Sequence, residues 1–234
     1  MDVDGSNLTR LTNNGFSDSG PNWFEAGGKI VFSSDRDGNQ NIYVMDADGS
    51  NQTALTTDGG NDDSPAWSPN GTKIAWRSNQ EIWVMDPDGS NKIRLTDNSF
   101  NDSNPTWCSN NRIAFDSIRG SWDIFIMNAN GTGESQLTAK RGHQTNPRCS
   151  PSAGKIAYHD ETQLAIMGLD GSNNTQISIQ SFRVASSWSP DGAQLLFNTT
   201  RDGNEEIYVT NADGSNQVRL TNNPAFDGNA DWAP

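Results

Sequence analysis

Short segments of alternating apolar and polar residues recur along the chain, each bounded by Gly, Asn or Asp. The clearest run holds KIAWRS (73–78) and EIWVMD (81–86), preceded by PAWSP (65–69) and Asn70-Gly71. Alternation with a period of two is typical of a half-buried β-strand, and Asn-Gly and Asp-Gly pairs are typical of tight hairpin turns. An Asp-Gly turn at 88–89 then leads into NKIRLT (91–96). The pattern predicts four short strands joined by hairpins.

The same pattern returns at a fixed interval through the whole chain. The turn glycines are Gly5, Gly49, Gly89, Gly131, Gly171 and Gly214. A second marker keeps the same interval at Trp23, Trp67, Trp107, Cys149, Trp188 and Trp232. The interval averages about 42 residues, and a repeat of 40–45 residues built from four strands is typical of the blades of a β-propeller.

The repeat divides the chain into blades of a single propeller domain, residues 1–234. We expect five complete blades at 21–56, 65–96, 105–138, 147–178 and 186–221. We expect an incomplete sixth blade, with an outer strand from 1–12 and an inner strand from 229–234. Its two middle strands, about 17 residues of the period, are absent. Two explanations stay open: the chain is an excerpt of a longer propeller, or another chain supplies the missing strands.

Composition taken without order gives a different impression. Leu, Ile, Val and Phe number only 40 of 234 residues and the net charge is −13, a combination typical of disordered chains. Asn, Asp and Gly number 73, and the repeat places many of them in turns. We expect no membrane span and no signal peptide in this chain. A pI near 4.4 argues against binding to nucleic acid, which requires Lys and Arg for its phosphates.

The two cysteines, Cys108 and Cys149, are too few for a disulfide framework. A single bridge between them is one interpretation. Two unpaired thiols are the interpretation that we favour from the sequence.

The best-preserved repeat, SSWSPDGAQLLFNTTRDGNEEIYVTNADGSNQVRLT (186–221), resembles the TolB-type β-propeller repeat. The resemblance covers the whole chain in degenerate form. It implies an all-β propeller with six blade positions, in which one blade takes its outermost strand from the opposite chain end. TolB-like propellers serve as protein-docking modules, as gating domains of peptidases and in some lyases, and most are periplasmic or extracytoplasmic. The resemblance therefore implies an extracytoplasmic location and a protein or peptide partner.

One repeat position lies in the loop that enters each innermost strand, at one mouth of the central channel. Around the ring it holds Asp18, Asp62, Asp102, Gln144, Arg183 and Asp227. Carboxylates around a narrow mouth attract a cation or a basic segment. The alternative, which we favour, is that each Asp caps its turn by accepting hydrogen bonds from nearby backbone amides.

The fourth blade departs most from the repeat. Its approach, AKRGHQTNPRCSP (139–151), carries Lys140, Arg141, His143 and Arg148. With Arg183 these groups make part of the mouth basic, which fits an anionic group such as a carboxylate. Equally, the cations neutralise their acidic neighbours. Whether the mouth binds cations or anions stays open.

Metal and catalytic chemistry find little support. The repeated Asp-x-Asp-Gly lacks the spacing of an EF-type calcium loop, so we expect no cofactor, with Ca²⁺ at the acidic mouth as an untested alternative. Only two histidines are present, which excludes a multi-histidine metal site. The related lyases use several metal-binding histidines at the mouth, where this chain has His143 alone.

We therefore expect a non-catalytic module that docks a peptide or protein segment at the channel mouth. The candidate binding residues are Asp18, Asp62, Asp102, His143, Gln144, Arg148, Arg183 and Asp227. One alternative is a hydrolase or lyase that uses mouth carboxylates and His143. A second is a structural repeat array without a ligand of its own.

Overall fold

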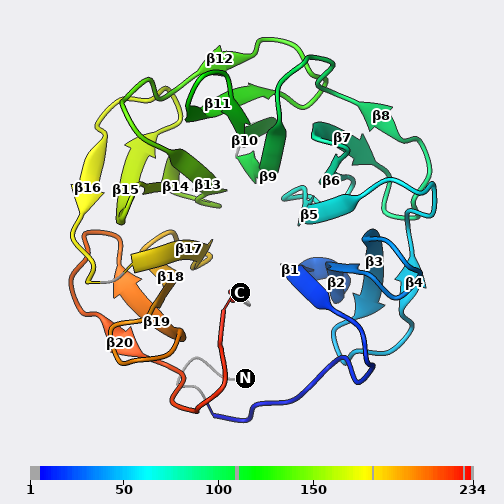
Figure 1. Ribbon diagram of the computed structural model, residues 1–234, viewed down its shortest axis with the longest axis horizontal. Coiled ribbons are helices and arrows are strands. Elements are labelled where there is room, and N and C mark those ends of the chain that lie inside the picture. The colour runs from blue at the N-terminus through cyan, green and yellow to red at the C-terminus, as the bar shows by residue number, and fades with distance from the viewer. Residues whose placement is uncertain (1–5, 109–110, 181, 229, 233–234) are drawn as a thin grey trace.

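The computed structural model describes residues 6–108, 111–180, 182–228 and 230–232, which form five four-stranded sheets around a central axis (Figure 1). The first sheet contains β1 (Asp18–Phe24), β2 (Lys29–Ser34), β3 (Asn41–Asp46) and β4 (Thr53–Ala54), with a 3-10 turn, η1 (Glu25–Gly27), after β1. The second contains β5 (Asp62–Trp67), β6 (Ile74–Ser78), β7 (Glu81–Met85) and β8 (Ile93–Arg94). The third contains β9 (Asp102–Cys108), β10 (Arg112–Ile118), β11 (Trp122–Asn128) and β12 (Ser135–Gln136).

The fourth sheet contains β13 (Gln144–Cys149), β14 (Lys155–Asp160), β15 (Gln163–Gly168) and β16 (Thr175–Ile177). The fifth contains β17 (Phe182–Trp188), β18 (Gln194–Thr199), β19 (Glu206–Asn211) and β20 (Val218–Arg219). Each sheet is an antiparallel meander whose first strand lies nearest the axis and whose short fourth strand lies at the rim (Figure 1). The predicted all-β propeller is confirmed for five blades. No helix among the described residues is long and apolar enough to cross a membrane.

The apolar cores lie between neighbouring blades. Between the second and third blades, Ile82 and Val84 pack with Trp107, Phe115 and Phe125, all of them buried. Similar clusters join the first blade to the second, the third to the fourth and the fourth to the fifth. Because each of the three middle blades packs against two neighbours, few large apolar residues per strand bury a continuous core. This accounts for the low aliphatic content.

A threonine at the end of four of the five repeats ties the outer strand to the third strand. In four blades its Oγ1 accepts the backbone N–H of an isoleucine at 2.9 Å, in the pairs Thr56–Ile42, Thr96–Ile82, Thr138–Ile124 and Thr221–Ile207. The hydroxyl satisfies a buried donor that the two-residue outer strand leaves unpaired. This explains why the repeat ends in Leu-Thr.

The turn glycine is required by both backbone conformation and space. Gly131 has a φ of 82°, and a Cβ added there would lie 2.9 Å from the carbonyl oxygen of Leu95 in the preceding blade. A side chain would therefore be strained and would clash. The same approach brings Gly49 of the first blade to Leu11, which lies in the N-terminal segment.

The innermost strands begin three residues earlier than the repeat proline suggests. The pairing of β1, β5, β9 and β13 with the second strand of each blade shifts register near the start of the strand, as at a β-bulge. Each strand continues on both sides of this bulge. In β5, β9 and β13 the residue with left-handed φ is Ser64, Asn104 and Asn146 respectively. The ring position that the sequence places in entering loops is therefore the first residue of these four strands.

The described terminal segments, which begin at residue 6 and end at residue 232, lie between the fifth and first sheets (Figure 1). The segment that ends at 230–232 runs from the rim to the axis (Figure 1). The backbone N–H of Trp232 donates to Ser187 Oγ at 3.2 Å, and that of Asp227 donates to the Glu205 carbonyl at 3.0 Å. The described parts of 1–12 and 229–234 form no strand, so an incomplete sixth blade is not shown. Residues 1–5, 229 and 233–234 lie outside the described residues.

Candidate functional site

We call the repeat position that holds Asp18, Asp62, Asp102, Gln144, Arg183 and Asp227 the ring position. Three of its residues lie in contacts between blades. Asp62, Asp102 and Gln144 are fully buried. The backbone N–H of Asp62 donates to the Gln40 carbonyl at 2.9 Å, and that of Asp102 donates to the Gln80 carbonyl at 2.8 Å. These residues therefore join the start of one blade to the hairpin of the preceding blade.

Their side chains also bond within the fold. Asp62 Oδ1 accepts from Trp76 Nε1 at 3.3 Å, Asp102 Oδ2 accepts from Asn98 Nδ2 at 2.8 Å, and Gln144 Nε2 donates to Asp160 Oδ1 at 3.0 Å. Each of the three side chains also keeps one buried oxygen without a hydrogen bond among the described residues, namely Asp62 Oδ2, Asp102 Oδ1 and Gln144 Oε1. Their role as ligand contacts stays a prediction.

Asp18 and Asp227 are half-buried, and each accepts from the asparagine four residues before it. Asn14 Nδ2 donates to Asp18 at 2.9 Å, and Asn223 Nδ2 donates to Asp227 at 2.5 Å. Asp18 also pairs with Arg36 at 2.9 Å. Burial by itself would raise the pKa of Asp18, but hydrogen bonds from Ser34, Arg36 and Asn14 outweigh burial and lower it.

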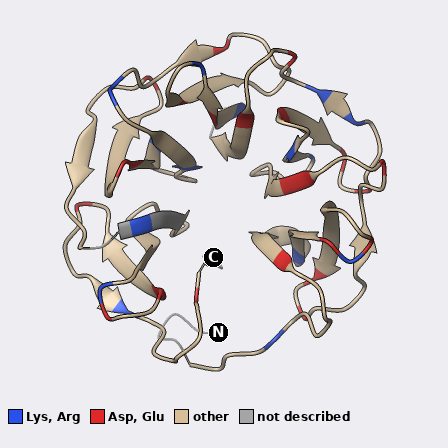
Figure 2. Cartoon of the chain, viewed as in Figure 1, with Lys and Arg blue, Asp and Glu red and all other residues tan. Residues whose placement is uncertain are grey.

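The basic groups of the fourth and fifth blades are more accessible. Arg141, His143 and Arg183 are exposed, whereas Lys140 is paired with Asp160 at 3.3 Å. Figure 2 shows acidic residues in β1, β5 and β9 and a basic residue in β17. The mouth is therefore accessible mainly through its cations.

Sequence reasoning did not identify three phenylalanines beside the ring position. Phe16, Phe100 and Phe226 are 56%, 40% and 77% exposed, and each lies one or two residues before a ring aspartate. The Arg119 guanidinium lies 5.3 Å from the centre of the Phe100 ring. Exposed aromatic side chains grouped at one end of a fold are typical of interaction surfaces. Their recurrence ahead of the ring aspartates was the signal in the sequence.

A cavity of about 550 Å³ follows the axis between the innermost strands. Its wall combines tryptophans and prolines with polar groups that include Asp63, Asn104, Arg148 and Asp231. Among the predicted binding residues, only Arg148 lines it. Asp63 is paired with Arg77 at 3.0 Å, and burial raises the pKa of Asp63.

Arg148 lines this cavity together with Asp231, and its charge also interacts with that of Asp116. Its Nη1 donates to the Pro147 carbonyl at 3.0 Å. Burial lowers the pKa of Arg148, while the charges of Asp231 and Asp116 oppose that shift. Burial also raises the pKa of Asp116 and of Asp231. Arg148 therefore offsets two desolvated carboxylates as well as facing the cavity.

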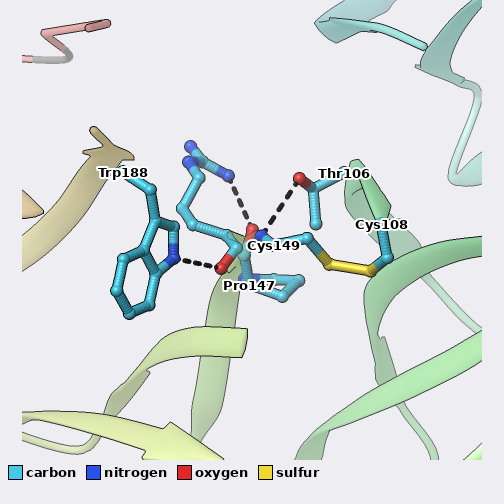
Figure 3. The surroundings of a disulfide bond; sticks show 6 residues. Thr106, Cys108, Pro147, Cys149 and Trp188 are labelled. Atoms are coloured by element: carbon cyan, nitrogen blue, oxygen red, sulfur yellow. Dashed lines mark hydrogen bonds between the residues drawn. A yellow bond between two sulfur atoms is a disulfide. The ribbon is translucent and has the colours of Figure 1, made fainter. Parts of the chain in front are cut away.

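A disulfide joins Cys108 at the end of β9 to Cys149 at the end of β13, with the Cα atoms 5.0 Å apart (Figure 3). Our expectation of two unpaired thiols was wrong, because the repeat brings the ends of adjacent innermost strands together. The backbone N–H of Cys149 donates to Thr106 Oγ1 at 3.4 Å, and Trp188 Nε1 donates to the Arg148 carbonyl at 2.8 Å. The bridge thus stands where other blades place a tryptophan.

His143 lies in the exposed approach to β13. No group of three or more His, Cys, Asp and Glu side chains that could hold a metal ion is found in the part of the chain that the structure describes. Catalysis at His143 and calcium at the mouth remain untested hypotheses.

Five meander sheets around a polar axial cavity define a β-propeller whose mouth presents cations and aromatic rings. The family profile described as the TolB beta propeller domain matches residues 1–115 and 64–182. The chain belongs to the TolB β-propeller family. No curated protein sequence matches it.

Solved structures agree on the fold. TolB from Acinetobacter baumannii is 22% identical with a TM-score of 0.86, and the match covers 100% of this chain and 61% of that chain. A candidate TolB from Agrobacterium tumefaciens is 20% identical with a TM-score of 0.77, and the match covers 90% of this chain and 83% of that chain. An oligogalacturonate lyase from Vibrio parahaemolyticus is 16% identical with a TM-score of 0.62, and the match covers 90% of this chain and 67% of that chain. The chain thus spans about three-fifths of the Acinetobacter protein, and these likenesses concern the fold alone.

Proposed function

We propose that this chain is a non-catalytic docking propeller that binds a peptide or protein segment at the mouth of the axial channel. The observation that carries the proposal is the grouping of exposed Arg141, Arg183, Phe16 and Phe226 at the end where the innermost strands begin. The axial cavity beside them is lined by Arg148 together with Asp63 and Asp231. Exposed aromatic and arginine side chains around a preformed hollow are typical of sites that hold a peptide.

The charges favour a segment that carries a carboxylate. The ring carboxylates are buried or bonded within the fold, whereas Arg141 and Arg183 point to solvent-accessible surface. Arginine binds a carboxylate through two parallel hydrogen bonds. The net charge of −13 opposes the approach of an acidic chain, so the aromatic contacts must supply part of the affinity.

We further propose that the chain ends make an incomplete sixth blade. Leu11 approaches Gly49 as Leu55 approaches Gly89, which supports an outer-strand place for the N-terminal segment. Asp227 repeats the backbone bond that Asp62 and Asp102 make, which supports an inner-strand place for the C-terminal segment. A β-hairpin of another chain in the gap is the alternative. A molecular mass in solution equal to one chain would contradict that alternative.

We place the protein outside the cytoplasm. Disulfides persist in oxidising compartments, and the Cys108–Cys149 bridge joins two blades. Membership of the TolB family supports the same location.

Selection from a randomised peptide library, followed by fluorescence anisotropy on a selected peptide, tests the docking proposal. We expect enrichment of Asp or Glu beside an apolar residue, and at least tenfold weaker binding in Arg183→Ala and in Phe226→Ala. Lys92→Ala, which removes one cation from the rim of the second blade, is the matched control and should leave binding unchanged. Equal binding in all variants would contradict the proposal.

The alternatives give different results in the same assay. Turnover of peptide or glycan substrates that is lost in His143→Ala would indicate a hydrolase or lyase. Binding that requires added calcium and is lost with a chelator would indicate a cofactor at the acidic mouth. Failure to select any peptide would favour a structural repeat array.

A further inference from the structure

In the first blade, each carboxylate oxygen of Asp46 accepts a hydrogen bond from a different side chain. Lys29 Nζ donates to Asp46 Oδ1, and Asn51 Nδ2 donates to Asp46 Oδ2 at 2.5 Å. Lys29 opens β2, and Asp46 faces it at the end of β3. The hydrogen bond from Lys29 is the main reason that the pKa of Asp46 is lowered.

The second blade repeats this arrangement. Lys73 Nζ donates to Asp86 Oδ1 at 2.5 Å, and Asn91 Nδ2 donates to Asp86 Oδ2 at 2.6 Å. The Lys–Asp–Asn group therefore occurs in the first two blades, whereas the strand ends at this place pair Arg112 with Asn128 in the third blade and Gln194 with Asn211 in the fifth.

The fourth blade keeps both donors and lacks the carboxylate. Lys155 opens β14, but the residue that faces it at the end of β15 is Gly168. Asn173, which takes the place of Asn51, donates to Ser172 Oγ at 3.4 Å instead. No hydrogen bond or ion pair of the Lys155 ammonium group is found among the described residues. Lys155 and Asn173 therefore lack the carboxylate that accepts from the corresponding lysine and asparagine in the first and second blades.

A cavity of about 500 Å³ adjoins this place, between the fourth and fifth blades. Its polar lining residues include Lys155, Asn173, Thr175, Gln176 and Asp213, and its apolar ones include Ile166, Ile177 and Ala212. A pocket of this size with an apolar wall and a few polar groups suits a small organic molecule.

We propose that the fourth blade binds a small organic carboxylate, whose carboxylate group takes the place that Asp46 occupies in the first blade. One carboxylate oxygen accepts from Lys155 Nζ and the other accepts from Asn173 Nδ2. The apolar body of the ligand lies against Ile166 and Ile177. This site is separate from the channel mouth and does not depend on the docking proposal.

Two features limit the affinity. Lys155 and Asn173 are exposed, and exposed charge pairs contribute little. Asp213 also lines the cavity, although its carboxylate accepts from the backbone N–H and Oγ of Ser215. We therefore expect a dissociation constant on the order of 1 mM.

A titration of the ¹⁵N-labelled protein with sodium benzoate, at constant ionic strength, tests the site by NMR. We expect saturable shifts of the amides of Gly168 and Asn173. Benzamide, which has the same ring without the charge, should bind at least tenfold more weakly. Acetate, which has the charge without the ring, should also bind more weakly than benzoate.

Two variants and one control locate the binding. Lys155→Ala and Gly168→Asp should each weaken benzoate binding at least tenfold, the second because its own carboxylate occupies the place. Gly168 does not have a left-handed φ, and an added Cβ would lie 2.9 Å from Asp170 Oδ1, 3.1 Å from Ser172 Oγ and 3.5 Å from the Ser172 carbonyl oxygen, so the Asp170 side chain must shift. Lys29→Ala, the same change at the occupied site of the first blade, should leave binding unchanged.

Binding that persists in Lys155→Ala with the same dissociation constant would overturn the proposal. So would benzoate shifts confined to Arg148 and its neighbours in the axial cavity. Because Lys155 is exposed, its replacement should not impair folding, and the result can be interpreted directly.

Discussion

The backbone N–H of Trp23 donates a 2.7 Å hydrogen bond to the carboxylate of Asp231, 208 residues further along the chain. The same oxygen accepts from Asn22 Nδ2 at 3.1 Å. On the other side of the same segment, Trp232 bonds to Ser187 of the fifth blade. The C-terminal segment therefore hydrogen bonds to the first and fifth blades together and closes the ring.

Asp231→Ala should lower the free energy of unfolding by about 2–3 kcal/mol, because it removes the side-chain acceptor of the part-buried Trp23 backbone N–H. Asp231→Asn keeps an acceptor oxygen and should cost less. Urea denaturation followed by tryptophan fluorescence measures both. Asp97→Ala, at a side chain that is 86% exposed, is the control. Equal stability of the Asp231→Ala and control variants would show that the C-terminal contact does not stabilise the ring.

Asp18 should contribute to acid sensitivity. Its pKa is lower in the folded protein, so the folded state binds fewer protons than the unfolded state between that value and about 3.9. The stabilisation is present above about pH 4 and is lost as the pH falls through the folded-state pKa. We expect unfolding free energies measured from pH 7 to pH 3 to fall less steeply in Asp18→Asn than in the unchanged protein. Parallel curves would contradict the assignment.

The disulfide should stabilise the fold by restricting the unfolded chain. For the 41-residue separation of Cys108 and Cys149, the chain-entropy estimate is about 4 kcal/mol. Reduction, or the double change Cys108→Ala and Cys149→Ala, should lower the urea midpoint accordingly. Mass spectrometry after alkylation of the denatured, unreduced protein should show no added label. Two labels would show that the thiols are free.

Gly131→Ala should destabilise the protein more than Gly59→Ala. Both glycines have positive φ, 82° and 78°, which costs an alanine about 1–2 kcal/mol at either position. Gly131 also approaches the Leu95 carbonyl, whereas nothing lies within 4 Å of a Cβ at Gly59. Overpacking should add at least about 1 kcal/mol at Gly131. Thermal unfolding of the two variants makes the comparison, and equal melting temperatures would contradict it.

Much of the fold could be predicted from the repeat. Its interval and its paired markers indicate five blades, and the Met of each of the first four blades faces an isoleucine of the second strand, as in Ile74–Met85. The start of the innermost strands could not be predicted, because the bulge that extends β5 depends on a left-handed Ser64. Serine rarely adopts that conformation, so the residue type gives no warning.

The site was less predictable. The ring position was identified from the repeat, but the burial of Asp62 and Asp102 depends on how adjacent blades pack. The bridge between Cys108 and Cys149 depends on the same packing. The sequence has Gly168 where the first two blades have an aspartate. That this glycine faces Lys155 follows only from the strand register that pairs the two residues.

The sequence by itself determined the blades of this protein, because alternation and turn residues act over a few positions and recur in register. Only the tertiary structure decided which polar groups are satisfied and which face a cavity. In the sequence, Asp46 precedes a turn and Asp231 lies near the C-terminus, and neither stands out. In the structure, Asp46 accepts from Lys29, whereas Asp231 accepts from the backbone of Trp23 in the first blade. Partners from distant blades make that difference, and no local pattern specifies them.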